Sequence, residues 1–228
     1  MATKASGPAP AGRDRPASQA DEAYASIRAR IITLELPPGA SIKEEAMAKE
    51  LSTGRTPIRE AVKRLALESL VSIYPQRGTF VSDVQITDLA AISEVRAQLE
   101  SYAARLASER WREGDLDELR GLRERVAESA HLPALELMAV DREVHEFIYR
   151  TARNEFLRAD LERYYALASR IWHLVLDRVP DLEANVRDHE ELLDAIAASD
   201  GSRANSIAGE HVGELARVMH QVLLDVPR

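Results

Sequence analysis

Residues 55–65 read RTPIREAVKRL, and this stretch decides the fold of the N-terminal part of the chain. Its apolar residues recur at spacings of three and four, which predicts a helix with one buried face. Arg55, Arg59 and Lys63 lie four residues apart and therefore share another face of that helix. Because arginine can donate two hydrogen bonds to a guanine base in the major groove, such a row is typical of a DNA-recognition helix.

The start of this helix carries further polar signals. Thr56 is expected to be the N-cap and Pro57 the first helical residue, since both residue types are favoured at those positions. The Thr56 hydroxyl and the Lys63 ammonium suit phosphate oxygens, which position a protein on DNA without reading its sequence. The alternative is an ordinary surface helix with solvated charges, which an isolated pair of arginines would favour.

Two more helices precede the recognition helix. The first is predicted from Asp21 to Leu34, where one apolar stripe ends at a Pro-Pro-Gly sequence. The second is predicted over about 41–51, with Ser41 as its N-cap and Glu44 completing a capping box.

A small hairpin follows the recognition helix. Residues 71–75 and 79–82 are rich in strand-forming residues and flank a turn in which Gly78 permits a tight bend. Arg77, at the tip of this turn, is placed to reach the minor groove of DNA. Three helices followed by a hairpin predict a winged helix-turn-helix domain over residues 20–83, and this order favours the DNA-binding interpretation.

The rest of the chain has no convincing strand pattern. Short connections between its helical segments predict an antiparallel six-helix bundle over residues 84–228, so the fold class is mainly α. Residues 1–19 are rich in Ala, Pro, Gly and Ser, and they are expected to form a disordered tail. The six predicted segments cover 87–111, 115–130, 134–152, 155–178, 182–199 and 202–224.

Composition limits the function classes. The 228 residues include no cysteine, which excludes disulfides and thiolate metal sites. No apolar run approaches 18 residues, so no membrane span is expected. The first residues lack an apolar core, so no secretory signal is expected either. We therefore expect a cytoplasmic protein. The net charge of −8 is unevenly placed, because residues 84–228 hold 28 acidic and 18 basic groups whereas residues 20–83 are neutral.

The histidine pattern predicts a metal site within the bundle. Asp141 and His145 are four residues apart on one predicted helix face, and His189 and His211 lie on two later helices that an antiparallel bundle can bring to the same point. One carboxylate and three imidazoles suit zinc first, with nickel, manganese or iron(II) as alternatives. An Asp-x-x-x-His pair can equally be an ion pair on an exposed helix.

The N-terminal part resembles the GntR superfamily of bacterial transcription regulators. The resemblance implies that Arg55, Thr56, Arg59 and the wing residues Arg77 and Gly78 touch double-stranded operator DNA. The chain departs from the family pattern at Gly54, where serine is usual, and at Ser69, where glycine is usual. The resemblance is carried by Leu36-x-Pro38-Gly39-x-x-Ile42, Arg55-Thr56-Pro57-Ile58-Arg59-Glu60-Ala61, Leu65-x-x-Glu68-x-Leu70-Val71 and Arg77-Gly78-Thr79-Phe80-Val81.

The C-terminal part resembles the FCD effector domain of the FadR-type branch of that superfamily, and its six predicted helices resemble the shorter, VanR-type variant. The resemblance implies that the Asp and His positions coordinate a divalent cation and that small carboxylates bind beside it. It is carried by Glu94-Val95-Arg96-x-x-Leu99-Glu100, Asp141-x-x-x-His145 with Asn154, His189-x-x-x-Leu193-x-x-Ile196, Asp200 and His211.

Two arginines are candidates for holding the effector. Arg96 can form a bidentate pair with a carboxylate, and the alternative is an ion pair with Glu100 one helical turn away. Arg170 is the second candidate. Gly209 and Gly213 bracket His211 within a helix, which indicates a close helix approach, room for a ligand or a loosely held final helix.

These observations predict a ligand-responsive transcription regulator, a repressor in its commoner form, that binds an inverted repeat as a homodimer. We expect no enzymatic activity, because motifs for phosphate binding, a nucleophile elbow and His-Glu-x-x-His are absent from the sequence. The alternatives are a metal-dependent hydrolase and a direct metal sensor.

Overall fold

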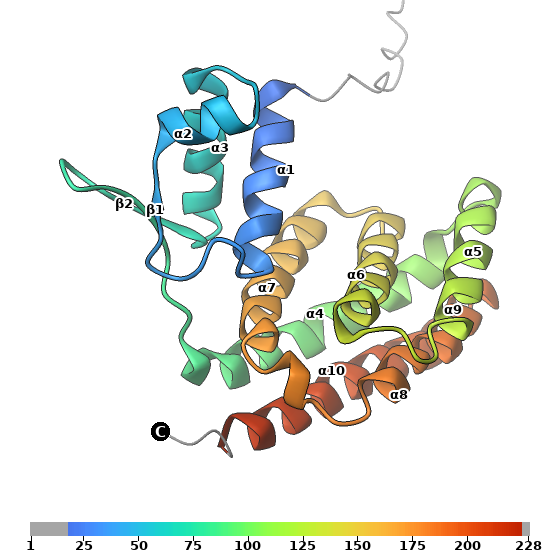
Figure 1. Ribbon diagram of the computed structural model, residues 1–228. Coiled ribbons are helices and arrows are strands. Elements are labelled where there is room, and N and C mark those ends of the chain that lie inside the picture. Colours follow the sequence, from blue (N-terminus) through green and yellow to red (C-terminus); the bar gives the residue numbers. More distant parts are fainter. Residues whose placement is uncertain (1–17, 225–228) are drawn as a thin grey trace, which may run out of the picture.

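The protein has an N-terminal part and a group of C-terminal helices (Figure 1). Each of these parts folds around its own group of buried apolar side chains. The computed structural model describes residues 18–224. We call residues 18–83 the head and residues 84–224 the bundle. The predicted tail lies almost entirely outside the described residues, and Gln19, expected in that tail, begins the first helix.

The first helix of the head, α1 (Gln19–Ile32), is fixed at its start by a reciprocal cap. The Ser18 hydroxyl accepts a hydrogen bond from the Asp21 amide, and the Asp21 carboxylate accepts one from the Ser18 amide. Ile27 and Ile31 are fully buried, as the apolar stripe predicts.

The segment after α1 corrects the predicted cap at Ser41. Ser41 and Ile42 form a short strand, β1 (Ser41–Ile42), and Ser41 pairs with Phe80. The next helix, α2 (Glu44–Glu50), has Lys43 at its N-cap and no side-chain capping bond, so the predicted Ser41–Glu44 capping box is wrong. Two residues are too short to show the alternation that identifies a strand in sequence.

The helix predicted from residues 55–65 is α3 (Arg55–Leu67), and it starts two residues earlier than expected. Its N-cap is Gly54, which makes no side-chain capping bond, so the assignments of Thr56 as N-cap and Pro57 as first residue are wrong. Proline is tolerated as the third residue because amides of the first turn have no partner within the helix. The predicted buried face is confirmed at Ile58, Val62 and Leu65.

The predicted hairpin is confirmed as β2 (Val71–Tyr74) and β3 (Gly78–Val81), which pair antiparallel in a sheet of order β1-β3-β2. Gly78 has a φ of +109°, a conformation that favours glycine. The turn between α3 and β2 holds Ser69 at a φ of +65°. This left-handed backbone gives a physical reason for the glycine that the resembling family usually has there.

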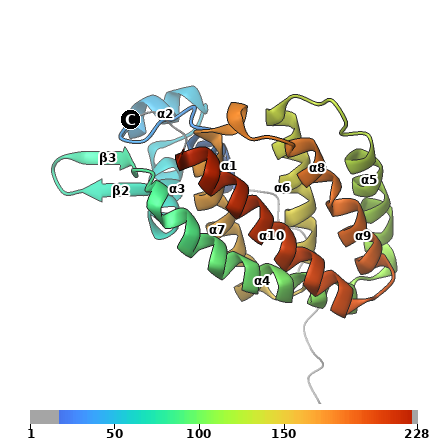
Figure 2. The same cartoon turned by 90° about the horizontal axis from the view of Figure 1, so that it is seen from below.

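The bundle contains seven α-helices within residues 84–224, one more than predicted (Figure 2). The predicted segment 182–199 is divided at Asp188 into two short helices, whereas the other five predicted segments each correspond to one α-helix. The helices are α4 (Leu89–Arg110), α5 (Leu116–Ala127), α6 (Ala134–Thr151), α7 (Glu155–His173), α8 (Leu182–Arg187), α9 (His189–Ala197) and α10 (Gly201–Leu224).

The head is attached to the bundle along α7. Arg28 of α1 donates a hydrogen bond to the Glu162 carbonyl at 2.7 Å, and Arg170 donates to the carbonyl of Ser82. Ala166 is fully buried among the apolar side chains of the head. One helix of the bundle therefore completes the core of the head.

The two longest helices of the bundle, α4 and α10, lie side by side (Figure 2). A Cβ added at Gly209 of α10 would stand 2.5 Å from Ser101 Oγ of α4, whereas one added at Gly213 would meet nothing within 4 Å. The close helix approach therefore explains Gly209 and leaves Gly213 unexplained by packing. None of the helices in the described part of the chain is long and apolar enough to cross a membrane.

This contrast gives a matched pair of substitutions. We expect Gly213→Ala to raise the free energy of unfolding by about 1 kcal/mol, because alanine is the better helix former and its methyl group has space. Gly209→Ala should give a smaller gain or a loss, since the Ser101 side chain must turn away. Denaturant titrations of the two variants check this, and a larger gain at position 209 would contradict it.

Candidate functional site

The structure brings together the four residues predicted as metal ligands. Asp141 and His145 project from α6, His189 is the first residue of α9, and His211 lies on α10. The Asp141 Oδ1 atom lies 3.6, 3.7 and 3.8 Å from the Nε2 atoms of His145, His189 and His211. All four side chains are buried, and one ligand atom from each lies within 4.8 Å of the others. We call them the Asp/His cluster.

The unpartnered atoms of this cluster test whether it fits a cation. Asp141 Oδ1 and the Nε2 atoms of the three histidines make no hydrogen bond to any residue of the described chain. Leaving a buried polar atom without a partner costs about 1–3 kcal/mol, so such atoms are rare in folded proteins. Here four of them converge. One carboxylate oxygen and three imidazole nitrogens form a donor set that fits a divalent metal ion.

A second layer of contacts orients these ligands. Tyr165 of α7 donates a hydrogen bond to Asp141 Oδ2 at 2.7 Å, which leaves Oδ1 for the centre of the cluster. The His189 Nδ1 atom lies 3.0 Å from the Val186 carbonyl, and this bond leaves the Nε2 lone pair facing inward. The His145 Nδ1 atom lies 2.8 Å from Glu100 Oε2. Such contacts fix ring orientation at metal sites.

The protonation of the cluster follows from burial and neighbouring charges. Burial lowers the pKa of His189 to about 4 and holds the pKa of His211 well below its usual value, so both rings are neutral, which is the metal-binding form. Burial also opposes a charge on Glu100, but Arg96 and His145 lower the pKa of that carboxyl to about 2. For His145, burial is outweighed by Glu100 and Asp141, which raise its pKa to about 9.

Arg96 reaches the cluster through Glu100. Its Nη2 atom lies 2.6 Å from Glu100 Oε1, and both side chains are at most 3% exposed. The guanidinium also lies over the rings of Tyr165 and Trp172, at 5.2 and 4.9 Å from their centroids. The ion pair that was the alternative for Arg96 is therefore present, in a buried setting where both charges need each other.

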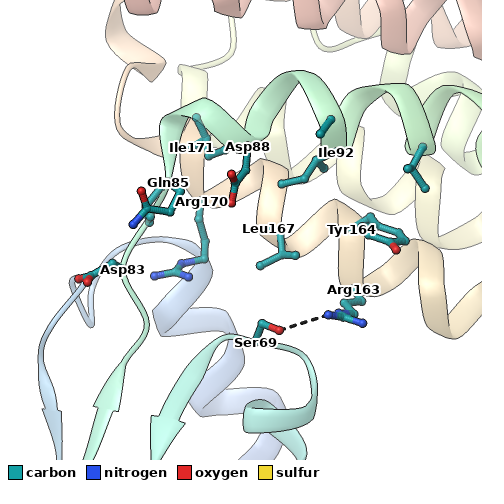
Figure 3. A pocket seen from close by; sticks show the side chains of 13 residues that line it. Ser69, Asp83, Gln85, Asp88, Ile92, Arg163, Tyr164, Leu167, Arg170 and Ile171 are labelled. Atoms are coloured by element: carbon teal, nitrogen blue, oxygen red, sulfur yellow. Dashed lines mark hydrogen bonds between the residues drawn. The ribbon is translucent and has the colours of Figure 1, made fainter.

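Arg170 lies in a different place, at the junction of head and bundle. It borders a cavity of about 470 Å³ between the two parts, together with Asp83 and Arg163, and Arg163 donates a hydrogen bond to Ser69 Oγ at 3.2 Å (Figure 3). The two arginines predicted to bind an effector thus do not share a site.

A second cavity leads from the head to the Asp/His cluster, and we call it the basic pocket. It has a volume of about 340 Å³ and lies between α1, α6 and α7. His145, Tyr149 and Tyr165 contribute to its wall. Its charged lining residues are Arg28, Arg142, Arg150, Arg158, Glu146 and Glu162.

Sequence reasoning missed several of these residues. Tyr165 sits in a helix whose pattern marks it only as core. Glu100 was named as a partner of Arg96 and as part of the FCD resemblance, but not as a residue that contacts the predicted metal ligands. The arginines of the basic pocket are scattered over three helices, so no local spacing connects them.

The predicted DNA-contacting residues lie on the surface of the head. Arg55, Thr56, Arg59 and Lys63 are exposed on α3, and Arg77 and Gly78 are exposed at the tip of the β2–β3 hairpin, which projects away from the bundle (Figure 1). The Arg59 Nε atom lies 2.7 Å from Glu44 Oε2 of α2. The second arginine of the row is therefore paired with a half-buried carboxylate in the free protein.

Comparisons with known proteins agree with this architecture. Residues 19–81 match the family described as bacterial regulatory proteins, gntR family, and residues 91–214 match the FCD domain. The HTH-type transcriptional repressor RspR of Escherichia coli is 23% identical over 87% of this chain and 88% of its own length. A probable D-xylose utilization operon transcriptional repressor of Paenarthrobacter nicotinovorans is 29% identical over 78% of each chain.

Among solved structures, E. coli McbR/YncC has a similar fold. The TM-score is 0.76 at 23% identity, over 90% of this chain and 98% of McbR/YncC. The FCD match alone spans more than half of the chain, and it follows directly after the match to the gntR family. The chain therefore belongs to the GntR family of bacterial transcription regulators, in the group whose C-terminal part is an FCD domain.

Proposed function

We propose that the protein is a ligand-responsive repressor that binds an inverted-repeat operator as a homodimer. A small organic acid, held near a divalent metal ion in the bundle, controls its affinity for DNA. The observation that carries the sensing half is the convergence of four unpartnered ligand atoms in the Asp/His cluster.

The exposed row on α3 supports the DNA-binding half of the proposal. Arg55 and Arg59 are candidates for base edges, and Lys63 and Thr56 for phosphate oxygens. Arg77 and Gly78 at the hairpin tip are candidates for the minor groove. Two-fold symmetry of a homodimer matches an inverted repeat, since each head then reads one half-site.

The residues of the cluster support the metal half. Asp141, His145, His189 and His211 would hold the ion, and Tyr165 would keep the Asp141 carboxylate turned toward it. The bound ion would supply a positive charge and open coordination positions for a carboxylate. Zinc is the first expectation, with nickel, manganese and iron(II) as the alternatives.

The basic pocket supports an acidic effector. Its lining holds four arginines and two glutamates although residues 84–228 as a whole are acidic, and His145 of the cluster borders it. One of its walls is α1 of the head. A ligand in this pocket would therefore contact both the cluster and the head, which gives a physical link between effector binding and the position of α3.

The structure alters the roles proposed for the predicted effector residues. Arg96 and Glu100 are both buried and paired, so we assign Arg96 to positioning His145 through Glu100. We assign Arg170 to the attachment of the head, because it donates to the Ser82 carbonyl. Arg142 and Arg158 line the basic pocket and are far more exposed than Arg96, so we assign them to the acid, which would compete with Glu162 for Arg158.

The DNA-reading role predicts a loss with one substitution and not with its neighbour. Arg59→Ala should weaken binding to the specific operator about 5- to 150-fold, the effect of losing a base contact worth about 1–3 kcal/mol. Glu44→Gln removes the partner of Arg59 and should leave affinity equal or higher. Fluorescence anisotropy with a labelled operator measures both, and equal losses in the two variants would show that only the ion pair matters.

The metal role predicts a change in metal content. His189→Ala combined with His211→Ala should abolish retention of one equivalent of metal after dialysis, measured by elemental analysis. His173→Ala combined with His220→Ala removes two histidines outside the cluster and should retain it. A full equivalent in the first double variant would disprove the site, provided circular dichroism shows that it has kept its helices.

The effector role predicts reciprocal coupling. In the metal-loaded protein, at least one of citrate, succinate and benzoate should weaken operator binding about 5- to 150-fold, and operator DNA should weaken acid binding by the same factor. Arg142→Gln should reduce this response, whereas Arg120→Gln, at an exposed arginine on α5 outside the basic pocket, should not. A response to metal alone, unaffected by the acids, would instead identify a direct metal sensor.

A further inference from the structure

The Asp/His cluster has a second approach, on the side away from the head. A cavity of about 450 Å³ lies beside α9 and α10, and His211 borders it. Its other charged lining residues are Asp188, Glu191, Glu210, Glu214 and Arg217. We call it the acidic pocket.

The charge of the acidic pocket is only partly balanced. Glu214 pairs with Arg217 at 2.5 Å and Glu191 with Arg203 at 2.7 Å. Asp188 has no ion pair within residues 18–224, and Glu210 accepts a hydrogen bond from the Ser206 hydroxyl without an ion pair there. Two carboxylates beside the cavity therefore have no cationic partner among the described residues.

His211 connects this pocket to the cluster. It is 5% exposed, its Nε2 atom lies 3.8 Å from Asp141 Oδ1, and neither of its ring nitrogens has a hydrogen-bond partner in the described chain. The other two imidazoles are anchored through Nδ1, His145 to Glu100 and His189 to Val186. The ring of His211 is thus the one in the cluster that no hydrogen bond holds in place.

Gly213 belongs to the same wall. It borders the acidic pocket two residues after His211, and a Cβ there would meet nothing within 4 Å. Packing does not require this glycine, and a glycine within a helix lowers stability by about 1 kcal/mol relative to alanine. The open space that it leaves beside His211 is a reason for its presence.

The two approaches to the cluster differ in charge. Each of the four arginines in the basic pocket, which reaches His145, is ion-paired with a glutamate, so this pocket does not attract a cation. The acidic pocket, which reaches His211, has two carboxylates without an ion pair among the described residues, and it would attract one. Clefts lined by one sign of charge raise the local concentration of counter-ions and their association rates by about 10- to 1000-fold.

We propose that the acidic pocket is the entrance through which a divalent cation reaches the Asp/His cluster. Asp188 and Glu210 collect the ion at the surface, and the unanchored ring of His211 receives it and passes it inward. Anions use the other entrance, so the metal and the acid arrive from opposite sides. This inference rests on the proposed metal centre and adds the route by which it is filled.

The rate of zinc uptake by the metal-free, full-length protein tests the route. A zinc-responsive dye followed by stopped flow gives the second-order rate constant. Asp188→Asn combined with Glu210→Gln should lower it about 10-fold or more at low ionic strength, and the difference should shrink in about 0.5 M salt because the charges are then screened. Equal rates in the wild type and this variant would overturn the proposal.

Two matched variants sharpen the result. Glu124→Gln combined with Glu128→Gln makes the same change in net charge at the end of α5, where both residues are exposed, and should leave the rate within about twofold of the wild type. Arg142→Gln removes a positive charge from the basic pocket and probes the other side of the cluster. A rate that changes in the Arg142 variant alone would place the entrance on the head side and overturn the proposal.

The wild type supplies an independent measurement if a variant fails to fold. Its uptake rate should fall as salt rises, since an attractive path is being screened, and a rate that rises with salt would overturn the proposal. The final stoichiometry separates this inference from the metal site itself. If all variants bind one equivalent of zinc at unequal rates, both the metal site and the route are supported. If they bind one equivalent at equal rates, the metal site stands and the route is rejected. If the wild type takes up no zinc, both are rejected.

Discussion

The bundle is built around a constraint that apolar packing alone does not impose. Four ligand atoms of the Asp/His cluster are buried without hydrogen bonds, and helices α6, α9 and α10 must converge to bring them together. Helices α4 and α7 add Glu100 and Tyr165, which hold His145 and Asp141 in place. An ion bound by such a set stabilises the folded state according to its concentration and affinity, because the unfolded chain does not offer the same site. Five helices thus depend on one small polar centre.

Helix α7 lies between that centre and the head. Tyr165 contacts Asp141, whereas Glu162 and Arg170 contact the head through their backbone and side chain respectively. Because these residues lie within three turns of one rigid helix, a shift at the cluster is also a shift at the attachment of the head. Helix α1 and His145 of the cluster also line the same basic pocket.

The parts of the structure that local pattern controls were predictable. The apolar face of α3, the wing hairpin and the spacing of Asp141 and His145 are all properties of a few neighbouring residues. The sequence could not show that Ser41 belongs to a strand, because its partner Phe80 is 39 positions away along the chain. Nor could it separate α8 from α9, since Asp188 carries no proline or glycine signal. The roles of Arg96 and Arg170 depend on which side of a helix faces which neighbour, and this is decided only when the bundle and the head come together.

The buried position of Ala166 among the apolar residues of the head limits how the protein can be taken apart. A head separated from the bundle would expose to water the apolar surface that α7 covers in the full chain. Exchange of heads between relatives would therefore succeed only when the segment of α7 that covers this apolar surface is exchanged as well. The folding unit that includes the head is therefore larger than the head itself, because part of α7 belongs to it.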